Sequence, residues 1–206
     1  IAPGWTASPY PGLEAFTPEQ APIYFGRGQE VDQLLEHFAN PQVHFVAVVG
    51  ISGSGKSSFV KAGLLPRLRN GIIDNTRWID LNFKPAERGA NPYLAMAYSL
   101  KSELNISGTS EQELAREMQA DGSVAQKHLS DLLAQHKQSN NLLLVIDQFE
   151  ELFTQCSPNE RKDFLVLMDN IVKQPSIRII ITLRADFYAR AIEEPILAKL
   201  LRQDRG

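Results

Sequence analysis

One short segment of the chain combines glycines, a lysine and a hydroxyl in a spacing that suits phosphate binding. The run Gly50-Ile51-Ser52-Gly53-Ser54-Gly55-Lys56-Ser57 matches G-x-x-x-x-G-K-[ST] at every fixed position. Glycines let the backbone fold around phosphates, and its N–H groups then form an anion-binding nest. Lys56 would supply charge to the phosphates and Ser57 an oxygen to Mg²⁺. The predicted nucleotide-phosphate site comprises Gly50, Ser52, Gly53, Ser54, Gly55, Lys56, Ser57 and Ser58.

Carboxylates follow a run of five apolar residues, 142–146, in the segment Asp147-Gln148-Phe149-Glu150-Glu151. We predict that Asp147 holds Mg²⁺ with Ser57, because Mg²⁺ prefers hard oxygen ligands. Glu150 or Glu151 would orient or deprotonate an attacking water, and the sequence does not choose between them. The alternative is that these acids only stabilise the start of the next helix.

Another apolar run ends in Thr182-Leu183-Arg184. In a parallel sheet this end would face the same edge as Asp147, so Arg184 is a candidate for contacting the γ-phosphate. The alternative is a surface ion pair with Asp186 or Glu193. Thr182 is a weaker candidate, because threonine is ordinary in strands.

Other polar groups give weaker signals. Phe25, Gly26 and Arg27 could wall an adenine pocket, but taken alone these three residues favour a simple turn over a binding site. The basic run of Lys61, Arg67 and Arg69 is most simply a solvated face. The four histidines and the lone Cys156 lack zinc-ligand spacing.

The elements that would position these residues alternate between strand and helix. We expect strands at 45–49, 77–81, 142–146 and 177–183. Helices are expected at 28–38, 56–66, 91–104, 158–173 and 187–201, with further helical pieces within 105–141 that break at 107–108 and 121–122. This alternation predicts an α/β fold with a mostly parallel sheet and helices on both faces.

Length and composition are consistent with that fold. The chain has 206 residues, 43% of them hydrophobic, which allows one α/β domain. The net charge of −3 gives no global basic field for nucleic acid. The sequence contains no apolar run of about 18 residues, so it predicts no membrane span. A single cysteine suits a reducing cytoplasm. The chain begins with Ile1 and has no signal segment, so we interpret it as part of a longer protein.

Several of these motifs line up in one order over nearly the whole chain, which resembles a STAND-class P-loop NTPase of the bacterial "novel STAND" type. The matching stretches are 9–13 with Phe16, 24–27 with Glu30, 53–58, 62–66, 91–95, 147–153 and 182–188. Gly28 departs from the family, which often has an acid there.

The resemblance implies a three-layer P-loop NTPase core at 26–206, with residues 1–25 as an N-terminal arm packing on it. It implies ATP or ADP as ligand, with Phe25, Gly26 and Arg27 near adenine and ribose. It further implies slow ATP hydrolysis in a nucleotide switch, with Asp147 on Mg²⁺, the hydrolytic residue in the Glu150/Glu151 pair and Arg184 as sensor. Self-association of the full protein, and sensor and effector modules in the same or a partner chain, are also implied.

The resemblance implies as well that the chain is truncated at its C-terminal side. The family's next strand would flank strand 45–49, so we expect that strand at an exposed edge, where it would promote association. Three rival functions stay open at this point. These are a scaffold with little or no turnover, a small-molecule P-loop kinase, and a DNA-handling ATPase, which the acidic balance disfavours.

Overall fold

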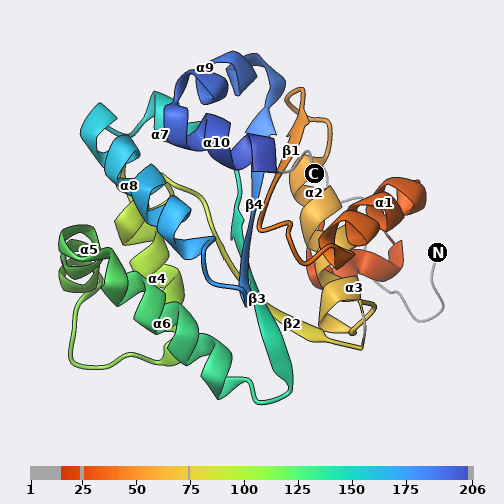
Figure 1. Ribbon diagram of the computed structural model, residues 1–206, viewed down its shortest axis with the longest axis horizontal. Coiled ribbons are helices and arrows are strands. Elements are labelled where there is room, and N and C mark those ends of the chain that lie inside the picture. The colour runs from red at the N-terminus through yellow and green to blue at the C-terminus, as the bar shows by residue number, and fades with distance from the viewer. Residues whose placement is uncertain (1–14, 24–25, 74, 204–206) are drawn as a thin grey trace.

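The computed structural model describes residues 15–23, 26–73 and 75–203. At its centre is a sheet of four parallel strands in the order β1-β4-β3-β2 (Figure 1). The strands are β1 (Phe45–Gly50), β2 (Arg77–Phe83), β3 (Ser139–Ile146) and β4 (Ile177–Arg184). All four predicted strands are present, and the predicted α/β class with a parallel sheet is confirmed.

The two inner strands, β3 and β4, carry the longest buried runs of the sheet. In β3 the residues 142–146 are all buried, and in β4 every residue except Arg184 is buried. Continuous Val, Ile and Leu runs form such strands because helices cover both faces of a parallel sheet. One apolar layer packs against α1 and the helices after the phosphate loop, and the other against the remaining long helices.

Thirteen helical segments surround the sheet in the described part of the chain. On one side lie α1 (Gly28–Ala39), α2 (Lys56–Ser58), the π-helical segment η2 (Phe59–Leu64) and α3 (Leu65–Arg69) (Figure 1). The other segments are η1 (Pro18–Ile23), α4 (Pro92–Leu104), α5 (Glu111–Ala120), α6 (Gly122–Gln135), α7 (Glu151–Thr154), α8 (Pro158–Ile171), η3 (Ala185–Phe187), α9 (Tyr188–Glu193) and α10 (Pro195–Gln203). None of the helices in the described ranges has the length and hydropathy to cross a membrane.

Side-chain caps explain where several helices begin. The Asn91 side chain accepts hydrogen bonds from the backbone N–H groups of Tyr93 and Leu94 at the start of α4. Ser110 and Ser157 each form a capping box with the glutamate three residues on. These contacts satisfy backbone donors that have no partner within the helix.

Two predicted helix boundaries are wrong. The helix that begins at Lys56 does not end at Pro66 but runs on to Arg69, because Pro66 lies in the first turn of α3, where no N–H donor is needed. The predicted helix 187–201 is divided into η3, α9 and α10, because Glu194 is extended and Pro195 starts a new helix.

Because the strands are parallel, the carboxyl ends of β1, β4 and β3 lie at the same end of the sheet. Gly50 of β1 lies beside Arg184 of β4, and Ile146 of β3 lies beside Ile181 of β4. The segments that follow β1 and β3 therefore start on either side of the end of β4. This juxtaposition positions the predicted phosphate loop and acidic segment.

Candidate functional site

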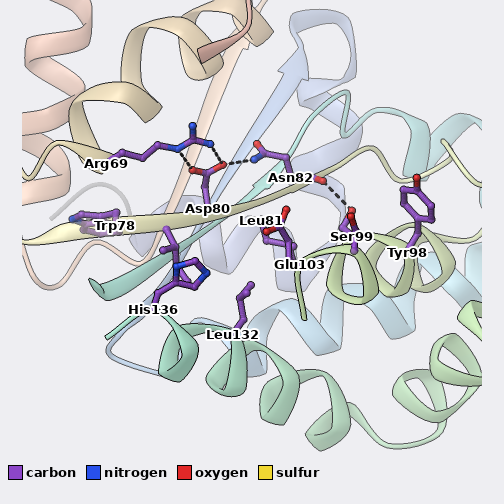
Figure 2. Close-up of a pocket in the computed structure, with 12 residues that line it drawn as sticks. Arg69, Trp78, Asp80, Leu81, Asn82, Tyr98, Ser99, Glu103, Leu132 and His136 are labelled. Atoms are coloured by element: carbon purple, nitrogen blue, oxygen red, sulfur yellow. Dashed lines mark hydrogen bonds and ion pairs between the residues drawn. The ribbon is translucent and has the colours of Figure 1, made fainter. Parts of the chain in front are cut away.

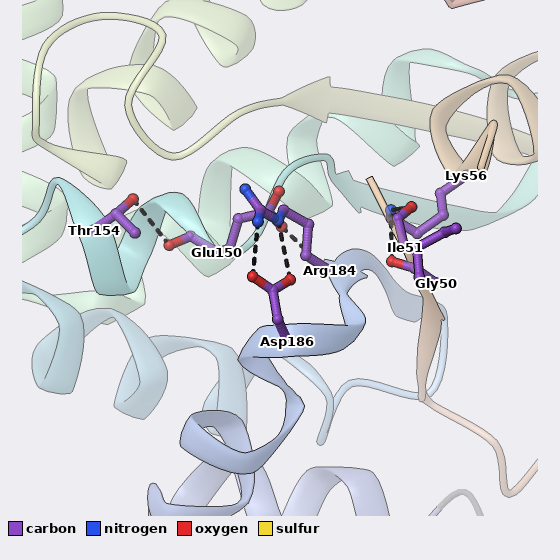
Figure 3. A network of polar contacts seen from close by, with 7 residues as sticks. All are labelled: Gly50, Ile51, Lys56, Glu150, Thr154, Arg184 and Asp186. Atoms are coloured by element: carbon purple, nitrogen blue, oxygen red, sulfur yellow. Dashed lines mark hydrogen bonds and ion pairs between the residues drawn. The ribbon is translucent and has the colours of Figure 1, made fainter. Parts of the chain in front are cut away.

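The phosphate loop joins β1 to α2. Gly53 and Gly55 have φ angles of +74° and +80°, a region that residues with a Cβ rarely adopt. The Lys56 ammonium bends back over the loop and donates to the carbonyl oxygens of Gly50 and Ile51, both at 2.9 Å (Figure 3). The loop thus combines the Lys56 ammonium with two backbone positions, Gly53 and Gly55, that require glycine.

Asp147 contacts the residue that follows the phosphate-loop lysine, and it is only 3% exposed. Its Oδ1 accepts hydrogen bonds from the Ser57 and Thr182 hydroxyls, each at 2.7 Å. Its Oδ2 lies 3.2 Å from the Lys61 ammonium. Burial alone would raise the pKa of Asp147, but these hydroxyls and the Lys61 charge together hold it below its ordinary value.

Thr182 connects two strands at this site. Besides donating to Asp147, its Oγ1 accepts the backbone N–H of Gln148 at 2.9 Å, and its carbonyl accepts the N–H of Phe149. Gln148 has a φ of +55°, an uncommon value for a residue other than glycine. The weaker candidate Thr182 therefore fixes both the carboxylate and the backbone after it.

The predicted solvated position of Lys61 is wrong. The sequence predicts it on a solvated basic face with Arg67 and Arg69, but it lines the phosphate cavity and pairs with Asp147. Arg67 and Arg69 pair instead with Asp32 and Asp80. One signal could have found Lys61, namely its position four residues after Ser57 on the same helix, which places both on one face.

The two glutamates occupy different environments. Glu150 lines the cavity, and its Oε2 accepts the backbone N–H of Arg184 at 3.2 Å. Glu151 does not line the cavity, and its Oε2 accepts the backbone N–H of Ala86 at 2.9 Å. Burial raises the pKa of Glu151. The structure therefore separates two residues that the sequence left equivalent.

Arg184 lines the same cavity, but its guanidinium is engaged. It donates to both carboxylate oxygens of Asp186, at 3.1 and 2.7 Å (Figure 3). It also lies 5.4 Å from the centre of the Phe187 ring. The alternative that the sequence offered for Arg184, an ion pair with Asp186, is therefore present. Arg184 nevertheless lines the phosphate cavity.

The remaining candidates lie around the loop. Arg27 donates to the carbonyl of Ser54 at 2.6 Å, and Gly26 precedes it with a φ of +97°. Buried Ser58 accepts the backbone N–H of Phe16 at 3.0 Å. Phe25 lies outside the described residues.

A cavity of about 690 Å³ unites most of these groups. Its lining is Ala15, Phe16, Ser52, Gly53, Gly55, Lys56, Ser57, Ser58, Lys61, Lys84, Asp147, Gln148, Glu150, Thr182 and Arg184. Of the predicted site residues in the described ranges, Gly26, Arg27, Gly50, Ser54 and Glu151 are not in this lining. Four of the lining side chains are cationic and two are carboxylates, so the cavity suits a polyanion.

The donor set at Asp147 also suits Mg²⁺. The Ser57 hydroxyl and the Asp147 carboxylate are hard oxygen ligands that already lie within hydrogen-bond distance of each other. No cluster of three or more His, Cys, Asp or Glu side chains in the described ranges could hold a metal by itself. A Mg²⁺ here would need further oxygens from phosphate and water, as is usual for this ion.

A second cavity, of about 440 Å³, lies along the edge strand β2 (Figure 2). Arg69 and Asp80 form a two-point ion pair there, and Asn82 donates to Asp80. The Ser99 hydroxyl donates to the Asn82 carbonyl at 3.0 Å. None of the predicted site residues lines this cavity, so it is separate from the phosphate site.

A family model described as "Novel STAND NTPase 1" matches residues 9–205. No curated protein matches the chain.

Among the solved structures that are similar to this chain, two illustrate the shared fold. The Walker-type ATPase paby2304 of Pyrococcus abyssi superposes with a TM-score of 0.55 at 17% identity, over 93% of this chain and 51% of its own. The ORC2 protein of Aeropyrum pernix, solved with ADPNP and ADP, superposes with a TM-score of 0.56 at 15% identity, over 87% of this chain and 46% of its own. The chain thus spans about half the length of each.

Proposed function

The chain belongs to the novel STAND NTPase family, and we propose that it is the ATP-binding, slowly hydrolysing nucleotide-switch module of a signalling protein. One observation carries the proposal. The buried carboxylate of Asp147, at the end of β3, is hydrogen-bonded to Ser57, the residue after the phosphate-loop lysine, within one cationic cavity. This pair is what a Mg²⁺–triphosphate site requires of a protein.

In this proposal the phosphate loop binds the nucleotide first. The loop amides and the N-terminus of the following helix would surround the β-phosphate. Lys56 would exchange the carbonyl oxygens of Gly50 and Ile51 for phosphate oxygens, which are stronger acceptors for an ammonium. Arg27, bonded to the loop at Ser54, would lie near adenine and ribose together with Gly26 and Phe25.

Ser57 and Asp147 would hold Mg²⁺, which supplies charge neutralisation to the phosphates when bound. Glu150 would position the attacking water, because of the two glutamates it alone lines the cavity. Arg184 would reach the γ-phosphate after leaving Asp186, an exchange of one anionic partner for another. Hydrolysis in such a site relies mainly on positioning and charge stabilisation.

Turnover of variants tests the role of Glu150. In Glu150→Gln we expect kcat for ATP to fall by about 10² or more, while the Kd for ATP changes little, because a water-positioning group contributes chiefly to the transition state. Glu151→Gln is the matched control, since Glu151 bonds to Ala86 outside the cavity, and it should keep most of the activity. Radiolabelled phosphate release and equilibrium binding give the two quantities. Full activity in both variants would contradict the role.

ATP turnover, its dependence on an acceptor metabolite, and DNA binding together separate the rival functions. A nucleotide-binding scaffold would bind ATP with no turnover in any variant. A small-molecule kinase would turn over ATP only with an acceptor metabolite. A DNA-handling ATPase would bind DNA in a salt-dependent way. The site contains Lys56, Ser57, Asp147 and Glu150 together, which supports turnover over the scaffold.

The wider context belongs to the same proposal. We place the N-terminal arm at 1–25 and the NTPase core at 26–206, with further domains beyond it. The full protein would be cytoplasmic, would self-associate in the ATP state and would connect to sensor and effector modules. The hydrogen bond from the backbone N–H of Phe16 to Ser58 Oγ supports the packing of this part of the arm on the core.

A further inference from the structure

Lys61 contacts the oxygen of Asp147 that the hydroxyls do not. Ser57 and Thr182 both donate to Oδ1, whereas the Lys61 ammonium lies 3.2 Å from Oδ2. The Lys61 side chain is 27% exposed and that of Asp147 is 4% exposed. The carboxylate is thus fixed, while its cationic partner reaches into the cavity from a long side chain that retains access to solvent.

The burial of Asp147 explains why a cation is needed there. An ionised carboxylate removed from water is costly unless a counter-charge and hydrogen bonds compensate it. Two neutral hydroxyls satisfy hydrogen bonds but leave the charge unbalanced. Lys61 balances this charge in the absence of a divalent ion. Mg²⁺ bound to the same carboxylate would be a second cation on a charge that Lys61 already neutralises.

We propose that Lys61 is a built-in counter-cation that neutralises Asp147 without metal and is displaced when Mg²⁺ binds. This inference rests on the proposed function of the site. Two consequences follow for the nucleotide. Without Mg²⁺, Lys61 keeps Asp147 from repelling the phosphates, so ADP stays bound. With Mg²⁺, part of the metal's binding free energy is spent on displacing Lys61. Lys61 therefore weakens the dependence of nucleotide binding on Mg²⁺.

A second lysine of the cavity provides a matched control. Lys84 lines the same space, but it forms no ion pair with Asp147. Replacing Lys84 removes a cation from the phosphates with and without metal alike. Replacing Lys61 changes the balance between the two conditions, because only Lys61 competes with the metal for Asp147.

The experiment is an equilibrium titration of the 206-residue chain with ADP, in Mg²⁺ and in EDTA, by calorimetry. The measured quantity is the ratio of the Kd in EDTA to the Kd in Mg²⁺. In Lys61→Met we expect this ratio to rise by about tenfold or more over wild type, since a hydrogen bond to a charged group is at stake. In Lys84→Met both Kd values should rise together and the ratio should stay near wild type. Lys61→Arg, which keeps the positive charge, should retain the wild-type ratio of the two Kd values.

The outcomes distinguish this inference from the proposed function. If wild type binds ADP and the Lys61→Met ratio equals that of Lys84→Met, the inference is wrong and the proposed function stands. If wild type does not bind ADP in either condition, both are wrong. Thermal unfolding checks each variant, and Lys61→Gln, with the same expected rise, replaces Lys61→Met if the latter does not fold.

Discussion

Asp147 is held by side chains from two other parts of the chain, so its ionisation is coupled to folding. Ser57 and Lys61 come from the helix after the phosphate loop, and Thr182 comes from β4. Despite burial, these groups lower the pKa of Asp147 in the folded chain. The unfolded chain therefore takes up this proton first as the pH falls.

This coupling gives a pH prediction with a definite sign. Because the folded pKa is depressed, the stabilisation from ionised Asp147 is present above the ordinary aspartate pKa and is lost as the pH falls through the folded value. Urea denaturation in EDTA at a series of acidic pH values should show wild type losing free energy of unfolding more steeply than Asp147→Asn. Parallel pH profiles for the two proteins would show that this carboxylate is not linked to folding.

The sequence predicted which charged side chains belong to the site better than it predicted the contacts that they make. Lys56, Ser57, Asp147 and Arg184 follow recognisable strand ends, and in the structure all four line one cavity. The choice between Glu150 and Glu151 depends on the turn after β3, which no pattern encodes. The role of Lys61 depends on a helix face meeting a carboxylate from a distant strand, which only the tertiary structure reveals.

The shape of the phosphate loop depends on backbone angles that glycine adopts more readily than other residues. Gly55 has a φ of +80° and open space where a Cβ would lie, so conformation and not crowding opposes a side chain there. Gly55→Ala should cost about 1–2 kcal/mol in the loop conformation, and we expect nucleotide affinity to fall by about 5–30-fold.

A second glycine serves as the control for this prediction. Gly28, at the start of α1, has no atoms within 4 Å of the place that a Cβ would take, and its φ is not left-handed. Gly28→Ala should leave the Kd for ADP unchanged when measured by the same titration. Equal losses in the two variants would contradict a specific requirement for glycine in the loop.

Element types were predictable from the sequence because the apolar runs are long and distinct. The strands at 142–146 and 177–183 are buried without interruption, and the start of α4 at Asn91-Pro92 is a clear capping signal. The errors come from prolines. Pro66 is accepted within a helix, whereas Pro195 divides one, and the difference depends on the π-helical segment 59–64 and on the extended backbone at Glu194.

For the molecule as a whole, the sheet order has a consequence for association. Within the described residues β1 pairs only with β4, so its other side is the edge of the sheet. Val49 on this strand and Ile51 just after it are 41% and 72% exposed. A strand edge with apolar side chains is a template for pairing with another chain.

We therefore expect the 206-residue chain to self-associate as its concentration rises, measured by light scattering. Val49→Lys should reduce the association, because a charged edge residue opposes strand pairing. Ile72→Lys is the control, since Ile72 is 63% exposed but lies outside β1. A stable wild-type monomer at high concentration would contradict association through this edge.

The family of the chain implies nucleotide binding, and the central claim of the proposed function is that the phosphate loop binds an adenine nucleotide with Mg²⁺. Equilibrium titration with Mg·ATP, Mg·ADP and Mg·GTP, in wild type and Lys56→Ala, tests it most directly. We predict that wild type binds ATP and ADP in preference to GTP and that Lys56→Ala binds none of them, because Lys56 supplies the loop's own charge to the phosphates. Wild type that binds no nucleotide, or a Lys56→Ala variant that binds as tightly as wild type, would contradict the claim.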